Sequence, residues 1–332
     1  MQVKEAVAAC LTQADGQFCS GAVLAKKLGV SRNAVWKAVQ ALQNEGFPIE
    51  ARKKTGYRIT QEADLLTADS VRPYLHTRVL GHPLYVHPEL DSTNARCRDL
   101  ARRGAAHGTV VAANSQTAGR GRQGRLFCSP PGSGLYFSVL LKQAVALQEA
   151  PMLTACAAVA AARAIDALYG THTQIKWVND LYLDGKKCCG ILTEGEVSLE
   201  SGKLECAIIG IGINVRNTQS SLPPELHPIV TSLEEAIPGC QVRRSELLAA
   251  VLYELEVLLP ELSFRRFLPE YRDRSCLIGK TAEITMENGA RKKVAVVEIA
   301  DDCGLVVRDS YGNVETLHAG EVHIGSGNLS DS

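Results

Sequence analysis

Residues 119–125 read Gly-Arg-Gly-Arg-Gln-Gly-Arg, and the pair Pro130-Pro131 follows after an interval of four residues. The three glycines match the fingerprint of dinucleotide-binding folds, which requires a helix to begin directly after them. Two consecutive prolines prevent such a helix from continuing, so the sequence argues against that fold. The P-loop pattern fails as well, because no Gly-Lys-Ser or Gly-Lys-Thr follows at the required spacing.

What remains is a flexible loop that carries Arg120, Arg122 and Arg125. Glycine lets backbone N–H groups approach a polyanion, and guanidinium groups form paired hydrogen bonds with phosphate or carboxylate oxygens. A triphosphate is the ligand that matches this loop best. The plainer alternatives are an arginine-glycine contact to nucleic acid and a merely solvated loop.

The chain has 332 residues, of which 45% are hydrophobic and 22% charged, which is the composition of a globular protein with one large or two to three ordinary domains. Lys+Arg and Asp+Glu balance at 36 each, so any nucleic-acid binding requires a local basic patch. Residues 1–60 provide one, because nine basic residues against four acidic ones give 9 − 4 = +5.

The same region predicts a winged helix-turn-helix. Apolar residues recur with a helical period over 3–14 and 22–28, and Ser31 stands where an N-cap would begin a third helix that runs to about residue 44. Residues 49–59 read as a hairpin around a basic turn, the wing. The candidate DNA-binding residues are Ser31, Arg32, Asn33, Trp36, Lys37, Gln40, Arg52, Lys53 and Lys54. A protein interaction module is the plainer alternative.

The rest of the chain predicts two further domains and a linker. Residues 63–80 contain Pro73, which interrupts a long helix, and we expect a linker there. Residues 81–273 alternate strand-like and helix-like runs, which predicts a mixed α/β domain. Strands are expected over 84–90, 109–115, 135–142, 181–183, 189–193 and 204–215, and helices near 92–103, 148–168 and 243–259. Residues 274–332 change to short strands separated by turn residues, which predicts a small β-barrel.

The location is expected to be cytoplasmic, with no membrane association. No secretory signal opens the chain, and the apolar stretch 152–169 contains Arg163 and Asp166, as a packed helix does. Eleven cysteines occur without a Cys-x-x-Cys pair, so we expect reduced thiols and neither a zinc knuckle nor a disulfide framework. No protein-borne metal site is predicted.

Two further motifs are candidates for chemistry. Lys176, Asp180 and Lys187 stand at the ends of expected strands, where they could converge on one cavity. The plainer interpretation is a pair of solvated lysines and an Asn-Asp turn. The segment 210–214 reads Gly-Ile-Gly-Ile-Asn, which suggests that a ligand approaches the backbone, although a glycine in a strand also marks a bulge.

The order of these motifs along the chain is similar to that of a known protein family. The winged helix-turn-helix is followed by Ser-Thr-Asn over 92–94, by 116–125, by Lys-Trp-x-Asn-Asp over 176–180, by Lys-x-Cys-Gly-Ile-Leu over 187–192 and by Gly-x-Gly-Ile-Asn over 210–214. Over nearly its whole length the chain resembles the bifunctional biotin protein ligase and biotin-operon repressor family. The resemblance implies a multidomain α+β protein: a winged helix-turn-helix (1–62), a linker (63–80), a class II synthetase-like catalytic domain (81–273) and an SH3-like β-barrel (274–332).

The activity implied by the resemblance is that of a biotin--[acetyl-CoA-carboxylase] ligase. Biotin and ATP form biotinoyl-5′-AMP, with Mg²⁺ helping to neutralise the phosphate charge, and a lysine of a biotin carboxyl carrier protein then accepts the biotin. The implied catalytic residues are Lys187, Arg122, Lys176 and Asp180. The implied biotin-binding residues are Ser92, Thr93, Asn94, Gln116, Gly119, Arg120, Gly121, Arg122, Lys187 and Gly190. The implied ATP-binding residues are Arg122, Arg125, Phe127, Lys176, Asn179 and Asn214.

The resemblance also implies a biotin-dependent repressor, in which the adenylate favours a homodimer through the central sheet whose paired winged helices bind operator DNA. Two positions depart from the family: Val178 stands where proline is common, and Phe127 where tryptophan often stands. The alternatives are a ligase without functional DNA binding, a ligand-sensing repressor without catalysis, and a lipoate-type ligase. Biotin-dependent exchange between ATP and pyrophosphate separates the ligase from the latter two.

Overall fold

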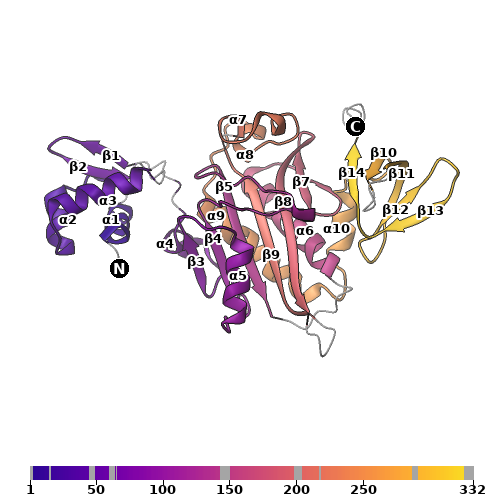
Figure 1. Cartoon of the computed structure of the whole chain (residues 1–332), viewed down its shortest axis with the longest axis horizontal. Coiled ribbons are helices and arrows are strands. Elements are labelled where there is room, and N and C mark those ends of the chain that lie inside the picture. Colours follow the sequence, from indigo (N-terminus) through magenta and orange to yellow (C-terminus); the bar gives the residue numbers. More distant parts are fainter. Residues whose placement is uncertain are drawn as a thin grey trace. The chain divides into compact units, whose positions relative to one another are not determined.

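The computed structural model describes residues 3–14, 16–44, 49–59, 64, 66–142, 150–197, 204–216, 218–285 and 291–324. The chain forms two compact units, Met1–Leu65 and Leu66–Ser332 (Figure 1).

The first unit is a winged helix-turn-helix, as the sequence predicts. It contains the helices α1 (Val3–Gln13), α2 (Gly21–Leu28) and α3 (Arg32–Asn44), followed by the antiparallel strands β1 (Ile49–Arg52) and β2 (Gly56–Ile59). Its core is formed by one stripe of each helix and by both strands, which pack together away from water.

Local signals set the bounds of these helices. The Ser20 side chain accepts a hydrogen bond from Val23 N at 3.1 Å where α2 begins, and Gly29 ends it with φ of 66°. Ser31 Oγ accepts a hydrogen bond from Ala34 N at 3.1 Å at the start of α3. The expected N-cap at Ser31 is therefore present.

The second unit is built on a seven-stranded mixed sheet. Strands β3 and β4 are parallel and every other neighbouring pair is antiparallel. The six strands expected from sequence in this part are all present, and β6 is an additional short one. In spatial order the strands are β3 (Leu84–His87), β4 (Val110–Ala113), β5 (Gly134–Leu141), β9 (Leu204–Asn214), β8 (Lys186–Val197), β7 (Asp180–Leu183) and β6 (Gln174–Lys176).

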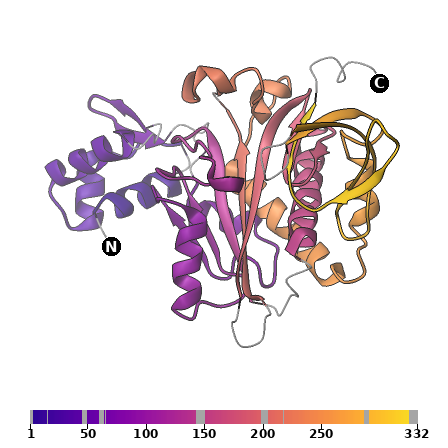
Figure 2. The same cartoon turned by 45° about the vertical axis from the view of Figure 1, so that its right-hand side comes forward.

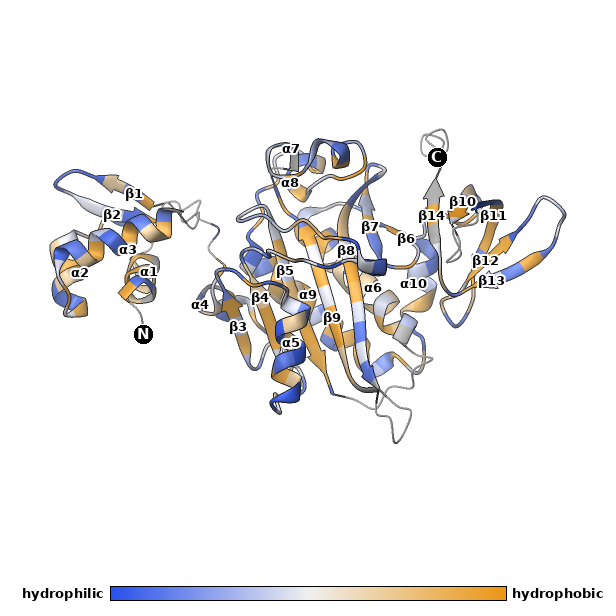
Figure 3. Cartoon of the chain, viewed as in Figure 1, coloured by the Kyte–Doolittle hydropathy of each residue, from blue (hydrophilic) through white to orange (hydrophobic). Residues whose placement is uncertain are grey.

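Helices cover both faces of this sheet. Helix α5 (Thr93–Arg102) packs on β4, β5 and β9, whereas α6 (Ala150–Tyr169) packs on β8 and β9 and against α9 (Arg244–Leu258). The alternation along β5 shows the two faces, because Phe137 lies in the core beside α6 and Leu140 in the smaller cluster beneath α5. The central strands are accordingly apolar along most of their length (Figure 3).

Helix α6 is a core helix. Its segment Pro151–Tyr169 is long and apolar enough to cross a membrane, but 72% of the window that meets this criterion is buried inside the protein. Alanines fill its buried face and let the helix lie close to the sheet. The expectation of a packed helix is confirmed.

The segment after Leu65 differs from the expected linker. Leu66, Val71 and Leu80 are each 1% exposed or less and lie in the main core, so residues 66–80 belong to the second unit. Burial of these side chains is a tertiary effect that Pro73 does not reveal. The remaining short elements are α4 (Ala68–Val71), η1 (Arg72–Tyr74), η2 (Arg122–Gly124), α7 (Thr218–Ser221), η4 (Pro224–Leu226), α8 (Leu233–Ala236), η5 (Leu259–Glu261) and α10 (Leu268–Asp273).

The C-terminal strands form a five-stranded antiparallel sheet that curls around itself in Figure 2. Its hydrogen-bonded order ends at β13 and β14, and the described residues do not pair these two edges. This coiled sheet stands where the sequence predicts a small β-barrel, with β14 added to the four expected strands. In spatial order the strands are β13 (Val314–Leu317), β12 (Leu305–Arg308), β11 (Arg291–Ile299), β10 (Thr281–Thr285) and β14 (Glu321–Ile324).

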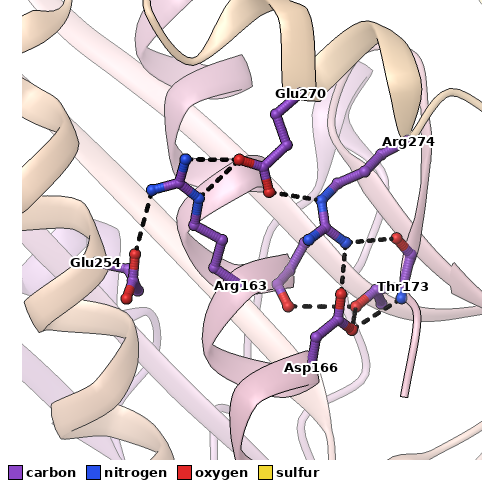
Figure 4. Close-up of polar contacts among 7 residues, drawn as sticks. Arg163, Asp166, Thr173, Glu254, Glu270 and Arg274 are labelled. Atoms are coloured by element: carbon purple, nitrogen blue, oxygen red, sulfur yellow. Dashed lines mark hydrogen bonds and ion pairs between the residues drawn. The ribbon is translucent and has the colours of Figure 1, made fainter. Parts of the chain in front are cut away.

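An ion-pair cluster joins the helices to the start of β6 (Figure 4). Arg274 is only 11% exposed in its side chain, donates to Asp166 at 2.5 Å and to Glu270 at 2.9 Å, and also reaches the Thr173 carbonyl at 3.1 Å. Asp166 in turn accepts hydrogen bonds from the backbone N–H and hydroxyl of Thr173. Arg163 bridges Glu254 and Glu270. The cluster thus holds the chain that enters β6 against α6 and α10.

Candidate functional site

One cavity of about 190 Å³ collects most of the residues that the sequence singles out. Its walls come from the start of α5, the end of β4, the arginine loop, the β6–β7 turn, the strands β8 and β9, and the C-terminal sheet. The lining residues are Ser92, Thr93, Asn94, Gln116, Arg120, Gly121, Arg122, Gln123, Arg125, Leu126, Phe127, Lys176, Trp177, Asn179, Asp180, Lys187, Gly190, Ile191, Leu192, Gly210, Ile211, Gly212, Gly320 and Val322.

The start of α5 and the residue Gln116 form a polar wall. Ser92 caps α5, and its Oγ lies 3.4 Å from Ala95 N. The Gln116 Oε1 accepts hydrogen bonds from the Thr93 N–H at 2.8 Å and from its hydroxyl at 3.1 Å. The Gln116 Nε2 donates to Ser129 Oγ at 2.8 Å. These contacts fix the Gln116 amide and leave one Nε2 hydrogen for a ligand.

The arginine loop is a tight turn whose ends lie side by side. Gly121 N donates to the Arg125 carbonyl at 2.7 Å, and Phe127 N donates to the Gly119 carbonyl at 2.9 Å. Between them the chain turns through η2, where Gln123 has a positive φ of 54°. The Arg122 guanidinium reaches Asn179 Oδ1 at 3.4 Å, which places this cation beside the β6–β7 turn.

Two glycines make room for the ring of Phe127. A Cβ at Gly212 would lie 2.5 Å from that ring, and a Cβ at Gly190 would lie 3.2 Å from it. The ring therefore lies close to the backbones of β8 and β9, and its edge meets Tyr136 with the centroids 6.3 Å apart. These two strand glycines are explained by close approach of a side chain.

The two lysines of the site have partners of different kinds. Lys187 Nζ lies 2.7 Å from Asp180 Oδ1. Lys176 Nζ donates to the Tyr182 hydroxyl at 3.3 Å and lies 5.4 Å from the centre of the Tyr182 ring. In the antiparallel pairing of β6, β7 and β8, Lys176 lies opposite Asp180 at the β6–β7 turn, whereas Lys187 lies opposite Tyr182, two residues farther along β7. The cavity therefore contains Lys176, Asp180 and Lys187 together.

Two residues of the sequence-based set do not line the cavity. Asn214 is 8% exposed, and its Nδ2 donates to the Thr231 carbonyl at 3.1 Å. Gly119 is buried at the base of the loop, where a Cβ would lie 2.4 Å from the Phe127 carbonyl oxygen. Both residues sit at the ends of segments that do line the cavity. A sequence motif includes neighbouring residues whether or not they face the cavity.

Sequence reasoning marks the segment of Gly210, Ile211 and Gly212 for the approach of a ligand but assigns no role to seven other lining residues: Gln123, Leu126, Trp177, Ile191, Leu192, Gly320 and Val322. Most of them lie inside or beside the motifs, and the glycines of 210–214 carry a signal of close approach. Gly320 and Val322 carry none. The C-terminal sheet brings them to the cavity, and it is fastened there by the Trp177 Nε1–H, which donates to the Cys303 carbonyl at 2.8 Å.

The first unit presents the candidate DNA-binding side chains. On α3 the residues Val35, Ala38, Val39 and Leu42 are buried, and the exposed residues are Arg32, Asn33, Trp36, Lys37 and Gln40. Lys53 and Lys54 are exposed in the turn of the wing. Arg52 is paired with Glu50 at 3.2 Å and lies over the Phe18 ring, so its charge is partly compensated within the protein.

Comparisons with known proteins agree with this arrangement. Residues 86–214 match the biotin/lipoate A/B protein ligase family, and residues 4–58 match a helix-turn-helix domain. The chain is 34% identical to the bifunctional ligase/repressor BirA of Bacillus subtilis over 95% of this chain and 96% of that relative. It is 30% identical to the biotin--[acetyl-CoA-carboxylase] ligase of Mycobacterium tuberculosis over 76% of this chain and 97% of that relative.

A solved structure is also similar. The biotin protein ligase of Aquifex aeolicus in complex with biotin and ATP matches with a TM-score of 0.60 at 29% identity, covering 72% of this chain and 97% of that one.

Proposed function

Because the chain belongs to the bifunctional ligase/repressor BirA family, we propose that it is an ATP-dependent biotin protein ligase and a biotin-dependent repressor. In the first step biotin and ATP give biotinoyl-5′-AMP and pyrophosphate. In the second step a carrier-protein lysine takes the biotin and AMP is released. The observation that carries this proposal is the convergence of five cations, Arg120, Arg122, Arg125, Lys176 and Lys187, on one cavity with a polar wall.

The first step joins two anions. A carboxylate oxygen of biotin attacks the α-phosphorus of ATP, and the bond from this phosphorus to the departing pyrophosphate breaks. The positive side chains reduce the repulsion between the reactants and stabilise the negative charge of the transition state. Lys187 contacts the biotin carboxylate, and Arg122 lies between carboxylate and phosphate. Lys176 and Arg125 contact the phosphates, and Phe127 packs on the nucleotide side.

The second step needs the adenylate to survive until the carrier arrives. The amine of the carrier lysine attacks the acyl carbon, the bond to AMP breaks, and the amine loses a proton. Residues 119–127 supply a loop that can cover the anhydride and exclude water. Asn214 contributes indirectly in this proposal, because its amide holds the segment that contains Thr231.

The residues present are compatible with Mg²⁺. Magnesium is commonly held by one or two carboxylates together with substrate phosphates. Asp180 is the one carboxylate among the described residues that line the cavity. Asp180 would hold the ion and Asn179 lies next to it, and the ion would neutralise part of the phosphate charge. In the described part of the chain no cluster of three His, Cys, Asp or Glu side chains offers an alternative site.

The ligase proposal is tested by exchange of labelled pyrophosphate into ATP. Exchange that depends on biotin, followed by labelling of a biotin carboxyl carrier domain, supports it. Exchange driven by lipoate or octanoate in place of biotin would contradict the assignment of the substrate. The same assay without biotin measures any background.

The repressor proposal rests on the exposed basic face of α3 and on the wing. We also propose that the adenylate favours a homodimer through β3, an edge strand of the central sheet. Two winged helices in such a dimer would bind a palindromic operator. Footprinting and sedimentation, each with and without biotin and ATP, test this proposal, and occupancy or mass that ignores the ligands would contradict it. Both of these partners, DNA and carrier, would place the protein in the cytoplasm.

A further inference from the structure

Asn94 occupies a position in the cavity wall where all its polar atoms have partners. The residue is 4% exposed. Its Nδ2 donates to Glu194 Oε2 at 2.6 Å, and the Leu192 carbonyl lies 3.4 Å from the same nitrogen. Its Oδ1 accepts a hydrogen bond from the buried Ser138 hydroxyl at 2.6 Å. Gly210 leaves space for this oxygen, because a Cβ there would lie 2.2 Å from it.

The partner Glu194 decides which way the Asn94 amide faces. An ionised carboxylate accepts hydrogen bonds and donates none, so the amide nitrogen must face Glu194. The opposite orientation would set the Asn94 oxygen against a negative charge. Both N–H groups of Asn94 are turned toward Glu194 and Leu192, so only the amide oxygen can bind a ligand. This oxygen has a second lone pair besides the one that Ser138 uses, so it can accept one more hydrogen bond.

We propose that Glu194 is a positioning residue for ligand recognition. By holding the nitrogen of Asn94, it makes this part of the cavity wall a hydrogen-bond acceptor, which suits a ligand head that carries N–H donors, such as a cyclic urea. The inference rests on the proposed function, since biotin has such a head. Glu194 itself does not line the cavity and acts through Asn94.

The sheet provides a matched control two residues away. Glu194 and Glu196 lie on the same face of β8, and both pair with arginines of α5. Arg98 lies 2.8 Å from Glu194 Oε1, and Arg102 lies 2.7 Å from Glu196 Oε1. The two glutamates are similarly exposed, at 27% and 28% of their side chains. Of the two, Glu194 is the one that contacts Asn94. A comparison of the two glutamates therefore separates the positioning of Asn94 from the support of α5 by ion pairs.

The first experiment compares E194Q with E196Q in the full-length chain. Biotin dissociation constants come from titration calorimetry, and KM values for biotin and ATP come from pyrophosphate exchange. Loss of a hydrogen bond to a charged group predicts that E194Q weakens biotin roughly tenfold or more, with the KM for ATP within about twofold of wild type. E196Q is expected to match wild type in both. Equal behaviour of the two variants, or equal losses for biotin and ATP in E194Q, would overturn the inference.

The second experiment reverses the hydrogen bond. N94D sets two carboxylates against each other and is expected to bind biotin poorly. In N94D/E194Q the new amide can donate to the new carboxylate, and part of the affinity is expected to return. If the loss of biotin affinity in the double variant equals the product of the losses in N94D and E194Q, the inference is contradicted. A fully active N94D would also contradict it. Thermal melting of each variant identifies any that fail to fold. A wild-type chain that binds no biotin would contradict the proposed function itself, which distinguishes that failure from one confined to Glu194.

Discussion

The ammonium of Lys187 and the carboxylate of Asp180 form an ion pair in the cavity wall, with Nζ and Oδ1 2.7 Å apart. Both side chains are partly shielded, at 28% and 19% exposed. Asp180 therefore holds the lysine in place before a ligand arrives, and a ligand carboxylate can take over part of that contact. The pair links the β7–β8 hairpin to the reaction proposed for the cavity.

Replacement of Lys187 tests this link. K187A removes the cation that is proposed to contact the biotin carboxylate, so adenylate formation is expected to fall about 10²- to 10³-fold, as is typical for loss of one group that stabilises developing charge. K186A is the control, because Lys186 Nζ reaches the His227 carbonyl at 3.4 Å and does not line the cavity. Initial rates of pyrophosphate exchange measure both. Equal rates for K187A and wild type would show that the site is misplaced.

The glycine at 212 predicts a steric effect on Phe127. A methyl group in G212A would lie 2.5 Å from the ring and force it away from β9, with a cost of about 1–3 kcal/mol in stability and a higher KM for ATP. In an F127A background the ring is gone, and the same substitution should cost much less. Thermal melts and exchange kinetics of the four proteins form a double-mutant cycle. Additive penalties would mean that the ring and the glycine are independent.

The cluster around Arg274 predicts a large loss of stability. R274M leaves Asp166 and part of Glu270 without their cation in a shielded place, so the free energy of unfolding is expected to fall by about 3–5 kcal/mol. R291M removes an arginine that is 70% exposed and paired with Glu283, and it should change stability by about 1 kcal/mol or less. Urea denaturation compares the two, and similar midpoints would contradict a structural role for the cluster.

The same cluster predicts a dependence on pH. Burial works to raise the pKa of Glu270, but hydrogen bonds from Arg163 and Arg274 outweigh it and hold this pKa below its ordinary value. A depressed carboxyl pKa adds stability at a pH above the unfolded value and loses it as the pH falls through the folded value. E270Q should therefore be less stable than wild type at pH 7, with the difference shrinking below about pH 4. Melting curves from pH 7 to pH 3 measure this, with E225Q, at an exposed position, as control.

The DNA-binding face predicts unequal contributions from basic residues. K37A removes an exposed cation of α3 and should weaken operator binding and lower the slope of log K against log salt by about 0.9. R52A should have a smaller effect, because Glu50 and the Phe18 ring already engage Arg52. Fluorescence anisotropy at several salt concentrations measures both. A larger slope change for R52A than for K37A would reverse the assignment.

Local signals explain why so much of the fold could be predicted. The cap at Ser31 and the apolar period over 3–14 and 22–28 act within a few residues, and the structure has α1, α2 and α3 where they indicate. The strand β6 has three residues, too few for a period to be visible, and β14 is also missed although it has four. Leu66 and Val71 are buried by contacts with distant elements, which a search for linkers cannot detect.

The residues of the candidate site also fall into those that the sequence reveals and those that only the fold reveals. Motif residues such as Lys176 and Lys187 can be found because their residue types carry the chemistry, and the antiparallel hairpins bring them together. Asn214 belongs to its motif but donates to Thr231 instead of facing the cavity. Gly320 and Val322 have no distinctive chemistry, and only the docking of the C-terminal sheet gives them a place in the wall.

The wall that Gly320 and Val322 supply has a consequence for synthesis of the chain. A ribosome that has passed Ile59 has made all the described strands and helices of the winged unit, which can then fold as it leaves the exit tunnel. The ligand cavity is complete only after Val322 has emerged and β14 has paired with β10. Nascent chains that stall between these points would carry the DNA-binding surface without the pocket that is proposed to control it.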